Sequence, residues 1–257
     1  MLHGKTVVLT RQKEQAAEMV RLIEEKGGNA LCFPTIATAP TEKTEARDAA
    51  LCRLATYDWL VFSSENAVRY FFEALRSLKK QWPEIKVAAV GSKTARALRD
   101  LHIEPDLLPQ KFTARGLLTA FANRGVQGQR FLLPVSHIAR KELPEGLRAL
   151  GAEADVVEFY RTLPHPDFDR QAFLRLLQQQ AACVLTFFSP SAFHSLLELL
   201  GEGAVEALKQ SGVILAAIGP TTARAVTQAG LPVEIVPKVN DGRHLLEAIE
   251  VYFEQKE

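Results

Sequence analysis

Serine, threonine and asparagine side chains stand at points of the chain where an apolar segment passes into a helical one. At the carboxyl ends of parallel strands, helix N-termini present unpaired N–H groups and a positive dipole end, which favour an oxygen-rich anion. The same residue types are preferred helix caps, worth about 1 kcal/mol each, and capping alone explains any single one of them. Taken as a set, they predict anion binding; the candidates are Ser64, Asn66, Thr94, Ser189, Ser191, Thr221 and Thr222.

Other residue types that carry out chemistry lack a suitable arrangement. The glycines form neither a GxGxxG fingerprint nor a phosphate loop, which disfavours a nucleotide ligand. The histidines have no Ser/Asp arrangement nearby, and paired carboxylates at catalytic spacing are not evident. Cys32, Cys52 and Cys183 lie in apolar stretches without CxxC or Cys/His spacing, so we expect buried thiols and no metal site.

Short apolar runs alternate along the chain with longer segments of helical period. Ala16, Met19, Val20 and Ile23, for example, recur at helical spacing between the first two runs. Strands buried on both faces that alternate with helices are typical of parallel sheets built from βαβ units. We therefore predict an α/β fold with strands at 6–10, 30–33, 59–62, 87–90, 106–108, 130–134, 155–159, 183–188, 213–218 and 233–236.

The chain contains two copies of one unit. "VGSKTARAL" at 90–98 aligns with "IGPTTARAV" at 218–226, and "VFSSENAV" at 61–68 aligns with "TFFSPSAF" at 186–193. A further pair is "GGNALCFPTIATAP" at 27–40 and "GAEADVVEFYRTLP" at 151–164. Two copies of a five-stranded unit account for the length of the chain, and the polar candidates occupy the same strand-to-helix turns in each copy.

Positions at which the two copies differ are not constrained by the structure that the copies share. Tyr160 stands where the other copy has Ile36, in an extended stretch that ends at a proline in both copies. A tyrosine there can point its phenol into a cleft, although a half-buried aromatic at a domain edge is the more common case. Arg11 follows the first strand, where the other copy has Ser136, and is either a carboxylate-binding cation or a solvated surface arginine.

The composition excludes several classes of partner. The 257 residues include 31 Lys and Arg against 30 Asp and Glu, so overall charge does not favour nucleic acid or an anionic membrane. The N-terminus leads directly into a strand pattern without a signal-peptide core, and no apolar run has the length of a membrane span. We predict a cytoplasmic protein with no nucleic-acid or membrane partner.

Five segments carry a family resemblance: "VFSSENAV", "VAAVGSKTARAL", "LGAEADVVEFYRTLP", "TFFSPSAF" and "AAIGPTTARAV". In this order, and over essentially the whole chain, they resemble the uroporphyrinogen III synthase family, and the lone tyrosine of "FYRT" is part of the likeness. Members of that family have two flavodoxin-like domains around a cleft, and the chain starts in one domain, builds the other and returns. The resemblance thus implies five-stranded parallel sheets with flanking helices in a first domain of 1–36 plus 165–257 and a second of 41–159, with connectors at 37–40 and 160–164. The repeat alone equally allows two contiguous halves.

The resemblance also implies a reaction. The family's substrate is hydroxymethylbilane, a linear tetrapyrrole polycarboxylate, which loses water, inverts ring D through a spiro intermediate and closes to uroporphyrinogen III without a cofactor. Such an enzyme is a lyase of haem biosynthesis. Tyr160 is then the candidate that assists departure of the hydroxyl group. Ser64, Thr94, Ser189 and Thr222 match family positions in the cleft, and we assign Arg11, Asn66, Ser191 and Thr221 to substrate binding with them. We expect a monomer, allowing a transient contact with the preceding pathway enzyme.

Two alternatives remain open at this level. Two α/β domains around a cleft also describe ligand-binding or effector-sensing proteins for a small anion, which do no chemistry. A degenerate relative that binds tetrapyrroles without ring inversion is the other alternative. Separation of the type I and type III products formed from hydroxymethylbilane distinguishes them.

Overall fold

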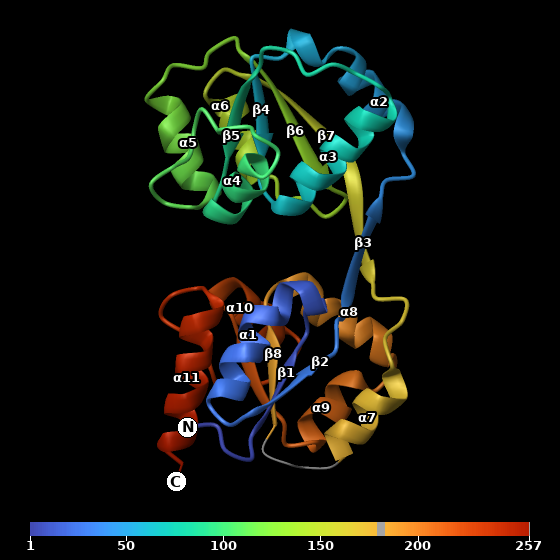
Figure 1. Ribbon diagram of the computed structural model, residues 1–257, viewed down its shortest axis with the longest axis vertical. Helices are drawn as coiled ribbons and strands as arrows, with labels where there is room; N and C mark the ends of the chain where they lie inside the picture. Colours follow the sequence, from blue (N-terminus) through green and yellow to red (C-terminus); the bar gives the residue numbers. More distant parts are fainter. Residues whose placement is uncertain (179–182, 257) are drawn as a thin grey trace. The chain divides into compact units, whose positions relative to one another are not determined.

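A computed structural model describes residues 1–178 and 183–256 of the chain. The chain divides into two compact units, unit 1 with Met1–Ala37 and Leu163–Glu257, and unit 2 with Thr38–Thr162. In each unit parallel strands are flanked by helices on both faces (Figure 1). The predicted α/β fold with parallel sheets and flanking helices is therefore confirmed. The predicted five-stranded sheet in each copy is wrong for unit 1, whose sheet has four strands among the described residues.

Unit 1 contains a parallel sheet in the order β2-β1-β8-β9. Its strands are β1 (Thr6–Leu9), β2 (Asn29–Cys32), β8 (Cys183–Phe187) and β9 (Ile214–Ala217). One face packs against α1 (Lys13–Glu25) and α11 (Gly242–Glu254). The other face packs against α7 (Arg170–Gln178), α8 (Pro190–Leu200), α9 (Ala204–Gln210) and α10 (Pro220–Gln228). The predicted helical spacing of Ala16, Met19 and Ile23 is confirmed, because all three are buried on α1.

Unit 2 contains the sheet of order β3-β7-β6-β4-β5. Its strands are β3 (Ile36–Pro40), β4 (Trp59–Phe62), β5 (Lys86–Ala89), β6 (Arg130–Ser136) and β7 (Glu153–Pro164). One face packs against α2 (Thr44–Cys52), α3 (Glu65–Ser77) and α4 (Ser92–Arg99), and a short 3-10 turn, η1 (Leu54–Thr56), follows α2. The opposite face packs against α5 (Ala114–Ala122) and α6 (Glu142–Ala149).

The sequence repeat is also a structural repeat. Under the alignment of the two copies, the order β7-β6-β4-β5 of unit 2 corresponds to β2-β1-β8-β9 of unit 1. The helices correspond as well, since α3 and α8 follow equivalent strands, as do α4 and α10. Each unit therefore presents the carboxyl ends of four aligned strands, three of which lead into equivalent helices.

The strands predicted at 106–108 and 233–236 are not strands in the structure. Each run contributes one isolated parallel bridge, from Leu107 to Ala88 and from Ile235 to Ala216. Prolines flank both runs, and a residue without an N–H group cannot extend a ladder. The carboxylates of Asp106 and Glu234 then accept the strand amides of Val87 and Leu215 at 2.7 and 2.8 Å.

The stretches predicted as connectors have regular structure. Residues 37–40 belong to β3, and residues 160–164 complete β7, which is longer than the strand predicted at 155–159. β3 lies beside β7 at one edge of the unit 2 sheet. The sequence predicts extended backbone at these places, but it does not predict that the two stretches pair as strands.

Candidate functional site

Tyr160 and Ser64 meet at the carboxyl end of the unit 2 sheet. Tyr160 is on β7 and only 7% exposed, and its phenol oxygen lies 3.0 Å from Oγ of Ser64. Ser64 is the N-cap of α3, where its Oγ accepts the amide of Ala67 at 3.1 Å. The helix therefore fixes the hydroxyl that contacts the phenol. The sequence predicted both residues separately, and the structure brings them into contact.

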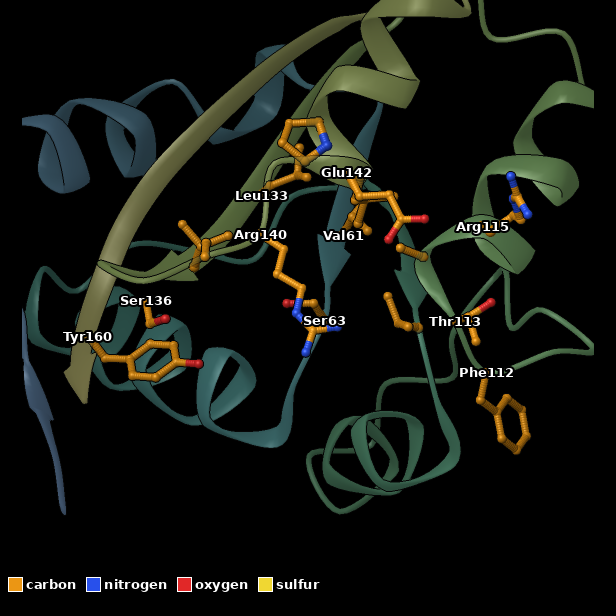
Figure 2. Close-up of a pocket in the computed structure, with 16 residues that line it drawn as sticks. Val61, Ser63, Phe112, Thr113, Arg115, Leu133, Ser136, Arg140, Glu142 and Tyr160 are labelled. Carbon is orange, nitrogen blue, oxygen red and sulfur yellow. The ribbon is translucent and has the colours of Figure 1, made fainter. Parts of the chain in front are cut away.

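A pocket of about 640 Å³ opens beside Tyr160. It lies at the strand ends of unit 2, since Ser63 follows β4, Val90 follows β5 and Ser136 ends β6. Figure 2 shows Tyr160 and Ser136 on one side of the pocket and Thr113, Arg115 and Phe112 on the other, with Ser63 and Arg140 between them. The complete lining is Val61, Ser63, Val90, Phe112, Thr113, Ala114, Arg115, Leu133, Val135, Ser136, Ala139, Arg140, Glu142, Leu143, Pro144 and Tyr160.

The polar part of this pocket favours an anion. Two helices begin in its wall, α5 after the N-cap Thr113 and α6 at Glu142. Arg115 and Arg140 contribute two positive charges against the single carboxylate of Glu142. Helix N-termini and guanidinium groups both stabilise carboxylates or phosphates, the latter through paired N–H donors. The apolar wall from β4, β6 and α6 suits a ligand that also has a flat or aliphatic body.

The other two unit 2 candidates lie in the first turns of helices. Thr94 is the third residue of α4 and is 4% exposed, so its side chain offers little surface to a ligand. Asn66 is the second residue of α3, next to the cap that contacts Tyr160, and is partly exposed. Neither residue lines the pocket. Their assignment to substrate binding remains a prediction.

The unit 1 candidates lie at the equivalent strand ends of that unit. Ser189 is the N-cap of α8, accepts the amide of Ala192 at 3.1 Å and lies 2.9 Å from the hydroxyl of Ser191. Arg11 follows β1, and its guanidinium lies 4.8 Å from the ring centroid of Phe188. This placement keeps the cation at the same end of the sheet as the two serines.

Thr221 and Thr222 occupy the first turn of α10. Thr221 is exposed, whereas Thr222 is 3% exposed and corresponds in the repeat to the buried Thr94. Gly219 caps this helix, and a Cβ at that position would lie 2.6 Å from Oδ1 of Asn240. The chain at Asn240 therefore packs directly against the turn that carries the two threonines.

Several residues of the pocket were not predicted from the sequence. Arg115, Arg140 and Glu142 are charged residues in helix starts or loops, and the repeat gives no contrast that singles them out. Tyr70 was also missed: its ring stacks on that of Tyr160, with centroids 5.3 Å apart and planes 9° from parallel. Its position on the apolar face of α3 makes it look like an ordinary core residue.

The described residues hold no group of three or more His, Cys, Asp or Glu side chains arranged to bind a metal ion. Within the same part of the chain, no helix combines the length and apolarity needed to cross a bilayer. Cys183 is buried at the start of β8, and this burial raises the pKa of its thiol to about 11. It packs in the core of unit 1, at the amino end of its strand and not at the carboxyl ends. Cys52 is exposed, so the expectation of buried thiols is wrong for this residue.

Parallel sheets flanked by helices, with polar side chains and helix N-termini gathered at the strand ends, define an α/β protein with its candidate site at the carboxyl edge of the sheet. Comparison with known proteins specifies the class further. The family model described as uroporphyrinogen-III synthase HemD matches residues 17–247. The chain belongs to this family.

Individual relatives agree. The chain is 34% identical over 231 residues to a putative uroporphyrinogen-III synthase of Methanothermobacter thermautotrophicus, covering 88% of this chain and 90% of the relative. It is 29% identical over 249 residues to the uroporphyrinogen-III synthase of Chlorobaculum parvum, covering 95% and 98%. Among solved structures, a mutant uroporphyrinogen III synthase of the extremely thermophilic bacterium Thermus thermophilus superposes with a TM-score of 0.65 at 24% identity, covering 98% of this chain and 99% of that one. The predicted family is thereby confirmed.

Proposed function

We propose that this chain converts hydroxymethylbilane into uroporphyrinogen III, with loss of water and inversion of ring D through a spiro intermediate. Membership of the uroporphyrinogen-III synthase family supports this function. The observation that carries it at the level of residues is the contact between the phenol of Tyr160 and the capping hydroxyl of Ser64, beside a pocket with an excess of positive charge. The enzyme is then a lyase that uses no cofactor.

The first task of this chemistry is to hold a flexible polycarboxylate. Acetate and propionate arms on each ring carry the charge, and the N-termini of α5 and α6 with Arg115 and Arg140 supply complementary donors in unit 2. We assign the same binding role to Arg11, Ser189, Ser191, Thr221 and Thr222 in unit 1, and to Ser64, Asn66 and Thr94 in unit 2. Donors spread over many turns fix the conformation of a long substrate better than one strong contact does.

The second task is to start the reaction at the hydroxymethyl group. Its hydroxyl leaves with a proton as water, and the azafulvene that remains is attacked by a pyrrole carbon to give the spiro intermediate. Oγ of Ser64 already accepts the amide of Ala67, and its own hydrogen can be donated to the phenol oxygen of Tyr160. The phenol hydrogen is then directed away from Ser64 and is available to the departing hydroxyl. Tyr160 assists departure by donating this hydrogen bond or the proton itself.

The third task is selectivity, because the azafulvene cyclises without help to the wrong isomer. The protein must therefore orient the two ends of the chain more than it accelerates bond formation. We propose that each unit is a flavodoxin-like domain, with domains of 1–36 plus 165–257 and of 41–159, and that both domains bind carboxylate arms of the substrate. The stretches 37–40 and 160–164 then connect the domains. The matching strand orders of the two sheets support a shared domain type.

The partners follow from this chemistry. The small-molecule substrate is the principal partner, and we propose a cytoplasmic monomer that makes at most transient contact with the enzyme that supplies hydroxymethylbilane. A short-lived substrate favours such proximity. Neither nucleic acid nor a membrane has a part in the reaction.

The test supplies hydroxymethylbilane from the preceding enzyme and separates type I from type III product after oxidation to porphyrins. The wild-type chain is expected to give type III, and Tyr160→Phe to lower kcat for type III at least tenfold with an unchanged unfolding midpoint. Tyr252→Phe is the matched control. This tyrosine lies on α11 of unit 1, where it is partly buried against the core of that unit and does not line the pocket. Type I product alone from the wild-type chain overturns the proposed function. Full type III turnover by Tyr160→Phe removes the role of Tyr160.

A further inference from the structure

Tyr70 contacts the ring of Tyr160 from the helix that also supplies Ser64. It lies on α3, is 6% exposed, and stacks on Tyr160 with ring centroids 5.3 Å apart and an interplanar angle of 9°. Tyr70 is not among the residues that line the pocket. Tyr70 therefore does not contact a ligand in this pocket directly, but it does contact Tyr160, which lines it.

The two contacts of Tyr160 restrict different motions. The hydrogen bond to Ser64 sets the position of the phenol oxygen, but a single bond leaves the ring free to tilt about it. The parallel stack on Tyr70 sets the plane of the ring. Both are needed to aim the phenol hydrogen in one direction, because a proton donor is effective only within a narrow range of geometry.

Tyr70 is itself held at its far end. Its hydroxyl donates to Oγ1 of Thr38 at 3.1 Å, and a guanidinium nitrogen of Arg69 donates to the same oxygen at 2.8 Å. The guanidinium of Arg69 also lies 4.5 Å from the centroid of the Tyr70 ring. Thr38 is on β3, next to the strand that carries Tyr160. A residue needed only to fill the core would not require a fixed hydroxyl.

We infer that Tyr70 is a positioning residue for the reaction: its ring fixes the plane of Tyr160, and its hydroxyl, bonded to Thr38, fixes Tyr70. This inference rests on the proposed function, because it assumes that the phenol of Tyr160 takes part in turnover. It makes α3, through Ser64 and Tyr70, the element that aims this phenol.

A double-mutant cycle tests the inference. Tyr70→Leu keeps an apolar side chain and removes the stack, so kcat for type III formation is expected to fall about tenfold, with KM changed less than threefold. In a Tyr160→Phe background the same change is expected to alter kcat less than twofold, since no phenol hydrogen remains to be aimed. Equal losses in both backgrounds mean that Tyr70 acts through the fold and overturn the inference.

A second pair of variants keeps the test valid if Tyr70→Leu does not fold. Tyr70→Phe and Thr38→Val both remove the hydrogen bond between Tyr70 and Thr38 while the stack remains, and Thr38→Val also removes the bond from Arg69. Each is expected to lower kcat two- to fivefold, and the double variant no further. Full kcat in both single variants overturns the role of the Thr38 contact.

The control for general loss of packing is Phe131→Leu, because Phe131 stacks on Trp59 at a similar interplanar angle of 8° in the same unit, away from the pocket lining. It is expected to lower the unfolding midpoint with kcat unchanged. A loss of kcat equal to that of Tyr70→Leu overturns the inference.

The same variants separate failure of this inference from failure of the proposed role of Tyr160. If Tyr160→Phe is fully active, the proposed role of Tyr160 fails. If Tyr160→Phe is impaired and Tyr70→Leu has the same effect in both backgrounds, the inference fails and the proposed function stands.

Discussion

Ser64 and Ser189 cap equivalent helices of the two units with the same geometry, yet their second contacts differ. Each accepts the amide three residues along at 3.1 Å, from Ala67 and Ala192. The hydroxyl of Ser64 then reaches the phenol of Tyr160, whereas that of Ser189 reaches Ser191. The capping role is therefore common to both copies, whereas among the described residues only the capping serine of unit 2 contacts a tyrosine hydroxyl.

This difference gives the first prediction. Ser64→Ala and Ser189→Ala are each expected to lower the free energy of unfolding by about 1 kcal/mol, because each removes an N-cap. Ser64→Ala is also expected to lower kcat for type III product several-fold, since the phenol loses the partner that orients its hydrogen. Ser189→Ala is expected to raise KM without this loss. Urea unfolding and product assays on the same preparations measure both effects.

The result that counts against this reading is a loss of kcat of the same size in both variants. It would mean that the capping bond alone controls activity. Ser64→Thr is the conservative variant, because threonine also caps helices and keeps a hydroxyl group on Cβ. It is expected to retain the unfolding free energy and most of kcat.

The charged residues of the pocket give the second prediction. Arg115→Gln and Arg140→Gln are each expected to raise KM about three- to tenfold while kcat changes little, because uniform binding of a carboxylate arm is lost. Removing the opposing carboxylate with Glu142→Gln is expected to lower KM. Lys80→Gln, at an exposed position outside the pocket lining, serves as the control for net charge.

Raised salt should reproduce part of this change, since it screens partly exposed charges. The wild-type KM is expected to rise with ionic strength and the KM of Arg140→Gln to rise less steeply. Identical salt dependence in the two proteins would exclude Arg140 from substrate binding.

Most of the secondary structure could be predicted because apolar runs and helical period directly report burial. The prediction of β4 is correct at both ends, and β5, β8 and β9 are placed within a residue of each end. The strand prediction is wrong around Leu107 and Ile235, where flanking prolines and side-chain carboxylates take the place of backbone hydrogen bonds between strands. Apolar character there reflects contact with the sheet and not membership of it.

The candidate site could be predicted only in part. The repeat exposed Tyr160, because a substitution between copies is visible in one sequence. It could not expose Tyr70, whose hydroxyl meets Thr38 from a position that helical period assigns to the core. Arg140 lies in a loop with no period at all. Contacts between distant segments, which decide such roles, leave no local pattern.

A glycine next to the pocket lining, one residue after Arg115, gives the third prediction. A Cβ on Gly116 of α5 would collide with the carbonyl oxygen of Lys111, whereas one on Gly146 of α6 meets side-chain atoms of Leu118, which can rotate. Gly116→Ala is therefore expected to cost about 1–3 kcal/mol of stability and to raise KM, because Phe112 and Thr113 line the pocket beside Lys111. Gly146→Ala is the paired comparison. Its gain in helix propensity offsets the repacking, so its stability should stay within about 1 kcal/mol of the wild type. Equal destabilisation by the two substitutions contradicts the prediction.

The cysteines give the last prediction. Burial raises the pKa of Cys183 to about 11, so only about one thiol in a thousand is ionised at pH 8, whereas Cys52 is exposed. Iodoacetamide at pH 8 is expected to modify Cys52 and to leave Cys183 unmodified until urea unfolds the protein, as read by peptide mass spectrometry. Because the pKa of Cys183 is higher in the folded state than its ordinary value of 9.0, its contribution to stability is complete below pH 9 and is lost as the pH rises toward 11. The free energy of unfolding should therefore fall more steeply between pH 9 and 11 in the wild type than in Cys183→Ala. Parallel pH curves for the two proteins would contradict the burial of Cys183 in the core of unit 1. Rapid modification of Cys183 in the folded protein would contradict it as well.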